Sequence, residues 1–152
     1  MGKGKRRTWL TWIAIPTDSE IVVQLYRAGI PLLGWIAAHY WFVVRDGDRC
    51  ERWEVWQSPN AGGRAIGHLH CDLKPPEANV GGGPTQLVAE WRGEEAARLQ
   101  RALSDGASYP FCHRYRYWPG PNSNTYVAWV FRQAGIAYPL GRLALGKNYS
   151  VS

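Results

Sequence analysis

The sequence has few cysteines, and their spacing does not suggest a shared role. Cys50, Cys71 and Cys112 are the three in the chain, so they cannot all pair with one another, and no C-x-x-C motif occurs. This argues against a disulfide framework and against a thiol redox motif. We expect reduced thiols, which favour the cytoplasm; the alternative is the periplasm or the exterior, reached by a route independent of a signal peptide.

Long apolar runs are also lacking. No stretch approaches the ~20 apolar residues of a membrane-spanning helix, so we expect no transmembrane segment. The segment from Thr8 to Pro16 is apolar but interrupted by threonine, and no A-x-A-like cleavage site follows it. A signal peptide requires such a site, so we predict a strand or docking segment here instead.

No internal repeat or low-complexity block divides the 152 residues, which is the length of one ordinary domain. The formal net charge is +6, but four of the positive charges lie between Lys3 and Arg7. Without these, the rest of the chain carries only about +2. We therefore divide the chain into a basic N-terminal tail and docking segment, residues 1–16, and a single domain, residues 17–152.

Two short patterns raise the question of a polyanionic ligand. Arg114 to Trp118, RYRYW, interleaves basic and aromatic side chains as single-strand nucleic-acid binders do. Gly81–Gly83 could cradle a phosphate, but no Lys-Ser/Thr and no helix follow it directly. Since the domain is nearly neutral, we predict no specific nucleic-acid binding and interpret RYRYW as a strand or a cleft wall.

Periodicity predicts an α+β fold, with an antiparallel sheet of about four to six strands and two main helices packed on it. The expected elements, in chain order, are a strand over Glu20–Gly29, a hairpin within Ile36–Gln57, a long loop with at most one short strand over Ser58–Gly83, a helix over Arg92–Asp105, a half-buried strand over Tyr109–Trp118, and a helix over Ser123–Ala134. A capping box at Thr17 and Glu20 leaves a helical start as the alternative for the first element.

The hairpin makes a specific prediction about two polar residues. Asp46-Gly47 is a strong hairpin turn, and if these two form the loop, Arg45 pairs with Asp48. Counting outward places His39 opposite Glu54 on one face of the sheet. A carboxylate beside a histidine fixes the imidazole tautomer and stabilises the imidazolium, so the pair is a candidate base and orienting residue. A register slip of one would send Glu54 to the opposite face.

The entrance of the last helix has more small polar residues than a cap requires. Asn122, Ser123, Asn124 and Thr125 stand together, and one of them suffices to cap the helix. Ser123 can be that cap or a nucleophile in the positive field of the helix N-terminus. N–H groups near Asn122 and Asn124 could then stabilise an oxyanion. Serine needs a neighbouring base for this role.

Other polar clusters offer alternatives. His68 and His70 share a face of an extended segment, and Cys71 or Cys112 could complete a metal site, although the spacing matches no strong zinc pattern. Cys112 and His113 could form a thiol–imidazole pair, but adjacent residues on a strand point to opposite faces. We therefore expect these residues to be structural and predict neither a metal nor another cofactor.

Three segments resemble a widespread bacterial family of domains of unknown function: residues 37–44, 109–132 and 139–150. Members of that family carry a His-x-Trp strand, a Trp-Pro-Gly-Pro-Asn-Ser-Asn-Thr-Phe motif and a closing Ile-Gly-Lys-Asp-Tyr. The resemblance runs from Ile21 to Tyr149 and is most specific at Trp118 to Tyr126. Tyr126 stands in place of Phe, and Asn148 in place of Asp.

That family in turn resembles circularly permuted papain-like proteins of the NlpC and lecithin-retinol-acyltransferase kind. Those proteins carry the catalytic histidine on an early strand, a polar residue on the next strand and an Asn-Cys-x-x-Phe motif at a later helix start. The resemblance implies that His39 is the base and Glu54 the orienting residue, and that Ser123 stands where the cysteine would be. The substitution fits either a serine enzyme or a domain that has lost catalysis.

Two functional hypotheses follow. The first is hydrolysis or transfer of an amide or ester acyl group by Ser123, His39 and Glu54, on a peptide, glycan-peptide or acyl substrate. The alternative is an inactive papain-like domain that binds peptide or glycan in an aromatic groove. The residues proposed for that groove are Trp35, Trp41, Trp56 and Trp118. The sequence leaves the oligomeric state open.

Overall fold

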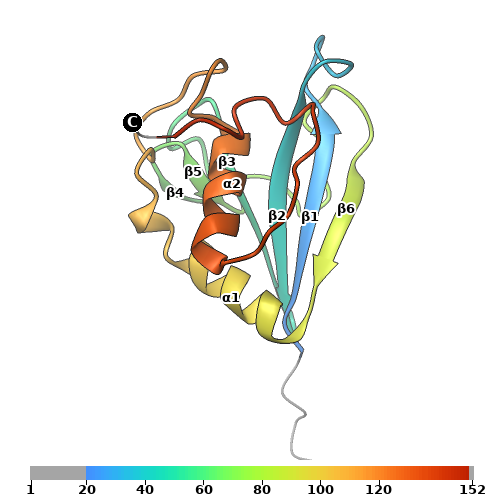
Figure 1. Cartoon of the computed structure of the whole chain (residues 1–152), viewed down its shortest axis with the longest axis vertical. Helices are drawn as coiled ribbons and strands as arrows, with labels where there is room; N and C mark the ends of the chain where they lie inside the picture. Colours follow the sequence, from blue (N-terminus) through green and yellow to red (C-terminus); the bar gives the residue numbers. More distant parts are fainter. Residues whose placement is uncertain (1–19, 151–152) are drawn as a thin grey trace, which may run out of the picture.

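The computed structural model describes residues 20–150, which form an antiparallel sheet with two helices packed on one face (Figure 1). The sheet has six strands in the order β4-β5-β3-β2-β1-β6. The strands are β1 (Val22–Gly29), β2 (Ala38–Asp46), β3 (Arg49–Val55), β4 (Arg64–Ile66), β5 (Leu69–Cys71) and β6 (Gln86–Trp91). This confirms the α+β prediction and its upper strand number. The N-terminal tail and the segment from Thr8 to Pro16 lie outside the described residues.

Alternation along β1 and β2 divides their side chains between the two faces of the sheet. Leu25 and Phe42 belong to the main core under the helices, whereas Tyr26 and Trp41 belong to a second, smaller core. Both sets are buried, because β2 lies in the middle of the sheet and both faces are covered. The strand predicted over Glu20–Gly29 is thus β1, and the helical alternative for it is wrong.

The β2–β3 hairpin forms as predicted, but its register differs by two residues. Asp46 pairs with Arg49 and Arg45 with Cys50, so the loop residues are Gly47 and Asp48. Gly47, the first residue of this two-residue loop, has φ +58. Hairpin turns that need a positive φ at this position favour glycine there. A shift of two preserves the alternation of faces. His39 and Glu54 are therefore diagonal neighbours on one face, not directly opposite residues.

The two helices have the predicted positions. In α1 (Gly93–Ser104), Ala96, Leu99 and Leu103 are buried against the sheet, and two glutamates lie in the first turn. Helix α2 (Ser123–Ala134) ends at Gly135, which adopts the left-handed conformation with φ +63. The helices contact each other as well as the sheet, and α2 lies over β2 and β3 (Figure 1).

The glycine-rich region has more structure than predicted. It contains two short strands, β4 and β5, which extend the sheet beyond β3. Gly82 packs so closely against the β1–β2 loop that an added Cβ would overlap the backbone of Gly29 and Ile30. A Cβ on Gly34 would lie 2.7 Å from the carbonyl oxygen of Gly82. The close contact between these two loops explains why residue 82 is glycine, with no need for a phosphate-binding role.

The strand predicted over Tyr109–Trp118 is wrong. This segment follows a 3-10 turn, η1 (Gly106–Ser108), and runs as turns and irregular chain to the start of α2. Pro110 has no N–H to donate to a sheet, and the N–H of Arg116 binds the carbonyl of Pro121 within the same loop. Of its tyrosines, Tyr109 is buried, Tyr115 half-buried and Tyr117 exposed, so the alternation of aromatic and polar residues does not reflect a strand.

Candidate active site

A chain of buried polar side chains crosses the sheet face that the helices do not cover. Glu54 on β3 is fully buried, and its Oε2 lies 2.7 Å from Nε2 of His39 on β2. Arg52 is also fully buried and donates from Nη2 to the same oxygen at 2.8 Å. Its Nε lies 2.8 Å from Oε1 of Glu54, but the angle is unsuitable for a hydrogen bond, so this contact is ionic. The predicted His39–Glu54 contact is present, with an arginine that the sequence did not suggest.

The loop between β5 and β6 completes the surroundings of Arg52. Nη1 of Arg52 donates to the carbonyls of Pro75 and Ala78, at 3.0 and 2.6 Å. The guanidinium stacks over Trp41 with 4.1 Å between its central carbon and the ring centre, and the Trp41 indole donates to the carbonyl of Pro76. Each charged group in the chain therefore has fixed partners, as burial requires.

Electrostatics keep Glu54 ionised. Burial by itself would raise the pKa of Glu54, but the hydrogen bond from His39 and the charge of Arg52 outweigh it and leave the pKa below its ordinary value. A carboxylate in this state is an acceptor for the imidazole. Because Nε2 of His39 is committed to Glu54, Nδ1 is the ring nitrogen left to contact another group.

The N-terminus of α2 is capped by Asn122. Its side-chain oxygen accepts from the N–H groups of Asn124 and Thr125, and the Thr125 hydroxyl accepts from the N–H of Asn122. These bonds form a complete capping box. Ser123 is consequently the first residue of the helix and not its cap. Among residues 20–150, its hydroxyl has no hydrogen-bond partner.

Asn124 has a structural role in this arrangement. Its amide nitrogen donates to the carbonyls of Ala38 and Leu145, and its oxygen accepts from the N–H of Tyr40. These bonds hold the start of α2 against β2 and against the C-terminal segment. Since the backbone N–H of Asn124 binds Asn122, the predicted oxyanion donor at this position is already occupied. The N–H of Ser123 itself is the one that the capping box leaves open.

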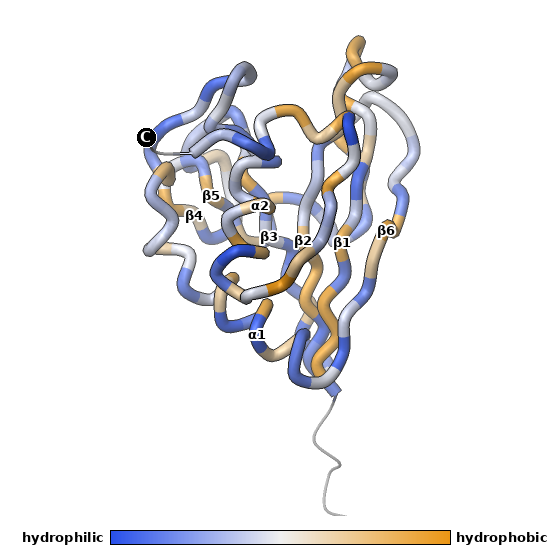
Figure 2. The backbone as a smooth tube through the Cα atoms, in the orientation of Figure 1, coloured by the Kyte–Doolittle hydropathy of each residue, from blue (hydrophilic) through white to orange (hydrophobic). Residues whose placement is uncertain are grey.

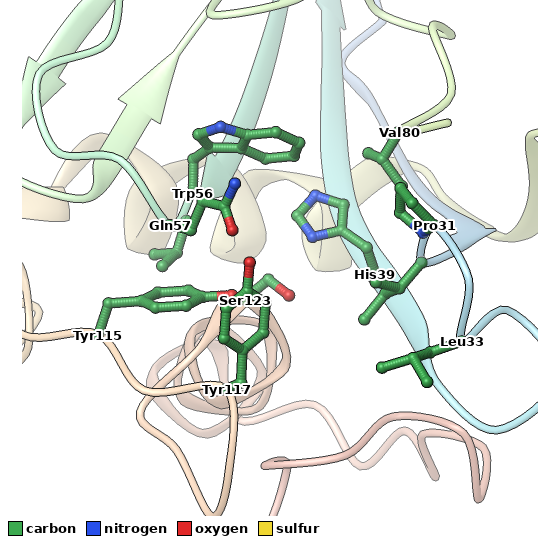
Figure 3. A pocket seen from close by; sticks show the side chains of 11 residues that line it. Pro31, Leu33, His39, Trp56, Gln57, Val80, Tyr115, Tyr117 and Ser123 are labelled. Atoms are coloured by element: carbon green, nitrogen blue, oxygen red, sulfur yellow. The ribbon is translucent and has the colours of Figure 1, made fainter. Parts of the chain in front are cut away.

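His39 and Ser123 line the same pocket, at the end of the sheet where β2 begins and β3 ends. The cavity measures about 370 Å³. Figure 3 shows both side chains directed into it from opposite elements, His39 from β2 and Ser123 from α2. The remaining wall is formed by Ile30, Pro31, Leu33, Val55, Trp56, Gln57, Val80, Tyr115 and Tyr117. A serine hydroxyl, a histidine held by a carboxylate and a largely apolar wall thus share one cavity.

The predicted aromatic groove is only partly present. Trp56 lines the pocket and meets the His39 ring edge-on, with 5.6 Å between ring centres. Trp41 lies in the second core beneath it and does not reach the cavity wall. Trp35 and Trp118 are exposed and lie outside the cavity lining.

The sequence analysis did not single out Gln57, and it predicted Tyr115 and Tyr117 only as part of a strand or a cleft wall. Tyr115 and Tyr117 lie in the RYRYW segment, which is an irregular loop, and both line the pocket, whereas Gln57 stands two residues after the end of β3. Gln57 places a side-chain amide in the same space as Ser123 (Figure 3). The one signal that could have indicated it is its position, two residues beyond Val55 at the end of the strand that carries Glu54.

The alternative polar clusters do not form sites. Within residues 20–150, no three His, Cys, Asp or Glu side chains are arranged to hold a metal ion. Nε2 of His70 accepts from the N–H of Ala61, and Nδ1 of His68 binds the carbonyl of Trp56. Burial raises the pKa of the Cys112 thiol, which donates to the carbonyl of Gly106, whereas His113 is exposed. His68, His70 and Cys112 thus each bond to the backbone of a neighbouring segment.

Comparison with known families assigns the chain. The family described as "Protein of unknown function (DUF3750)" matches residues 20–149. The chain belongs to the DUF3750 family. The match includes all the strands and helices described above, so the pocket and the buried polar chain lie within the DUF3750 domain. No curated protein and no solved structure matches the chain.

Across residues 20–150, none of the helices has the length and apolar character needed to cross a membrane. The two helices of the DUF3750 domain instead use their apolar sides to cover the sheet.

Proposed function

We propose that this DUF3750 domain is a serine hydrolase or acyltransferase that acts on an ester or amide bond in the pocket of His39 and Ser123. The observation that carries the proposal is that different residues cap α2 and face the cavity. Asn122 caps the helix, which leaves the Ser123 hydroxyl without a structural partner, in the same cavity as a histidine held by a carboxylate. A serine that only capped the helix would be bonded to backbone N–H groups.

The proposed reaction begins with attack of Ser123 Oγ on the carbonyl carbon. Nδ1 of His39 accepts the hydroxyl proton, while Nε2–H remains bonded to Glu54, which stabilises the imidazolium. His39 then gives this proton to the departing alcohol or amine, leaving an acyl-serine ester. Water, or a second acceptor in an acyltransferase, attacks that ester with His39 again as base, and Ser123 recovers its proton.

The oxyanion formed in each step needs hydrogen-bond donors. The N–H of Ser123 lies at the positive end of α2 and is not used by the capping box. The side-chain amide of Gln57 supplies a second donor from the end of β3. Two donors from different elements form a fixed oxyanion hole, which is worth about 10²–10³-fold per donor in acyl-transfer enzymes.

Arg52 acts through Glu54 as a positioning residue. It holds the Glu54 carboxylate in place and keeps it ionised, so that the hydrogen bond from His39 has an acceptor with one orientation. Because Glu54 shares its charge between Arg52 and His39, the carboxylate stabilises the imidazolium less than an unpaired one would. We infer that orientation is its larger contribution.

The chain order supports a more specific form of the proposal, a permuted papain-like scaffold with serine in place of cysteine. A histidine strand, a second polar residue on the next strand and a nucleophile at a later helix start follow one another here as His39, Glu54 and Ser123. A serine in this position needs its base more than a cysteine would, because its hydroxyl is a weaker nucleophile at neutral pH.

Hydrolysis of a panel of p-nitrophenyl acyl esters and amides tests the proposal. We expect Ser123→Ala and His39→Ala to lower the rate by about 10³-fold or more, and Gln57→Ala by about 10²-fold. Ser104→Ala removes an exposed hydroxyl at the end of α1 and is the matched control, with an unchanged rate. If wild-type protein hydrolyses nothing in the panel but binds a peptide or glycan in the Trp56 and Tyr115 pocket, the domain is a binding module instead.

A further inference from the structure

The loop between β1 and β2 exposes an unusual set of apolar side chains. Leu32 is 96% and Trp35 79% exposed, and Leu33 and Ile36 are also exposed. Leu32 also has φ +64, a backbone conformation that is uncommon for a bulky residue. Figure 1 shows this loop as the end of the molecule farthest from the start of β1, and Figure 2 colours its tip hydrophobic. Such a patch on a folded domain indicates an interaction surface.

A second loop extends this surface across the mouth of the pocket. Leu33 and Tyr117 both line the cavity and are also exposed, so they form opposite sides of its rim. Trp118, next to Tyr117, is 70% exposed. We call Leu32, Leu33, Trp35, Ile36, Tyr117 and Trp118 the apolar rim. Three of these residues, Trp35, Tyr117 and Trp118, are aromatic with a polar tip, which is typical of the interface between water and lipid.

The two loops that form the apolar rim carry basic but no acidic side chains. From Ala28 to Val44 the chain carries no charged residue, and after Asp105 it has no acidic residue at all. The second loop instead contributes two exposed arginines, Arg114 and Arg116. Arg142, also exposed, lines the same surface hollow as Trp118. An apolar tip beside these arginines is complementary to a bilayer that contains anionic lipid.

We propose that the apolar rim docks the pocket mouth onto the surface of a lipid bilayer containing anionic lipids. Leu32 and Trp35 enter the interface, while Arg114, Arg116 and Arg142 contact headgroups. A bilayer fits better than a protein groove because the exposed residues lie on a loop at the end of the molecule (Figure 1), and the arginines of the neighbouring loop can meet anionic headgroups. The proposal goes beyond the proposed hydrolysis, because docking involves no turnover and can be measured without it.

Co-sedimentation of the full-length chain with vesicles tests the proposal. One set of vesicles is phosphatidylcholine alone, and a second contains about one third phosphatidylglycerol. We expect binding to the anionic vesicles and weaker binding to the neutral ones. Combining Leu32→Asn with Trp35→Ser is expected to lower the partition coefficient at least about tenfold, since each side chain loses its burial in lipid. Asparagine suits the positive φ of position 32, and both residues are exposed, so folding is preserved.

Two matched variants separate the apolar rim from other contributions. Ile66→Ser with Leu87→Asn removes two exposed apolar residues elsewhere on the sheet and is expected to change binding by less than about twofold. Replacing Lys3, Lys5, Arg6 and Arg7 by serine tests the basic tail alone. It is expected to weaken binding to anionic vesicles while leaving the effect of the rim substitutions in place.

Four results would overturn the proposal. These are no binding of the wild-type chain to either vesicle, a rim variant that binds like wild type, and binding that depends on the basic tail alone. The fourth is a dimer in sedimentation equilibrium that the Leu32 and Trp35 substitutions dissociate, which would assign the apolar rim to a second copy of the chain.

Discussion

The two faces of the sheet are covered in different ways. Helices α1 and α2 cover one face with apolar side chains, among them Leu99 and Val127. The other face carries Trp41, Arg52 and Glu54 beneath a loop that has no regular structure. The apolar face needs only matching volumes, whereas the polar face needs a partner for each charge. The same constraint that makes the polar face demanding to fold also fixes His39 at the rim of the pocket.

The largest expected effect separates the two faces most sharply. Arg52→Met leaves Glu54 buried without its arginine, which should lower the free energy of unfolding by about 3–5 kcal/mol. Arg49→Met on the same strand is the matched control, because Arg49 pairs with Glu51 at the surface and should contribute less than about 1 kcal/mol. Urea unfolding measures both. Equal effects would mean that the loop-covered face does not stabilise the fold.

On the helical face, Leu99→Ala should lower the free energy of unfolding by about 2–5 kcal/mol, because it leaves a cavity between α1 and the sheet. Leu87→Ala on β6 removes a leucine that is 50% exposed and should have an effect within about 0.5 kcal/mol. Unlike Arg52→Met, Leu99→Ala should leave the His39–Glu54 contact intact, so ester hydrolysis should survive at temperatures where the variant is folded. Loss of activity in folded Leu99→Ala would contradict the separation of the two faces.

Acid should lower the free energy of unfolding through the polar face, where Glu54 becomes protonated. The loss should be smaller than for Arg52→Met, because protonation leaves the packing in place. The pKa of Glu54 is lower in the folded protein than its ordinary value of 4.5. The stabilisation is therefore fully present above about pH 4.5 and is lost as pH falls through the lower folded-state pKa. Unfolding measured from neutral pH to pH 3 should show a smaller decline in the double variant Arg52→Met, Glu54→Gln. Parallel declines would show that other carboxylates, such as Glu51, account for the acid sensitivity.

The smallest effects distinguish two neighbours at the start of α2. Asn122→Ala removes the helix cap and should lower the free energy of unfolding by about 1 kcal/mol or somewhat more. Ser123→Ala removes a hydroxyl without a structural bond and should change it by less than about 0.5 kcal/mol. Thermal unfolding of both variants checks this difference. A larger loss for Ser123→Ala than for Asn122→Ala would return Ser123 to a capping role.

The sequence was sufficient for the elements that follow local rules. Helix α2 is predicted from Ser123 to Ala134 because its apolar residues repeat at helical spacing and Gly135 ends it. The hairpin is predicted because Gly47 marks its turn. The two-residue error in register arose because Asp-Gly was assigned to the loop as a unit, whereas Asp46 belongs to the strand.

The site was predictable only in part, because its partners come from distant segments. His39 and Glu54 share a face by alternation, and alternation survives the error in register. Arg52 lies on that face too, but its partners are the carbonyls of Pro75 and Ala78, which no periodicity connects to β3. Gln57 and Tyr115 enter the pocket from irregular segments, where no periodicity in the sequence predicts the direction of a side chain. Trp41 was assigned to the groove because aromatic character alone does not distinguish a residue of a pocket wall from a residue of the hydrophobic core.

The most direct test of the central claim is the mapping of a fluorophosphonate adduct on the intact protein. If His39 activates Ser123, mass spectrometry should find one adduct per chain, on the peptide that contains Ser123, and Ser104 should remain unmodified. The adduct should disappear in His39→Ala while that variant remains folded by circular dichroism. An unmodified wild-type chain, or an adduct on Ser123 that forms equally well without His39, would contradict the account.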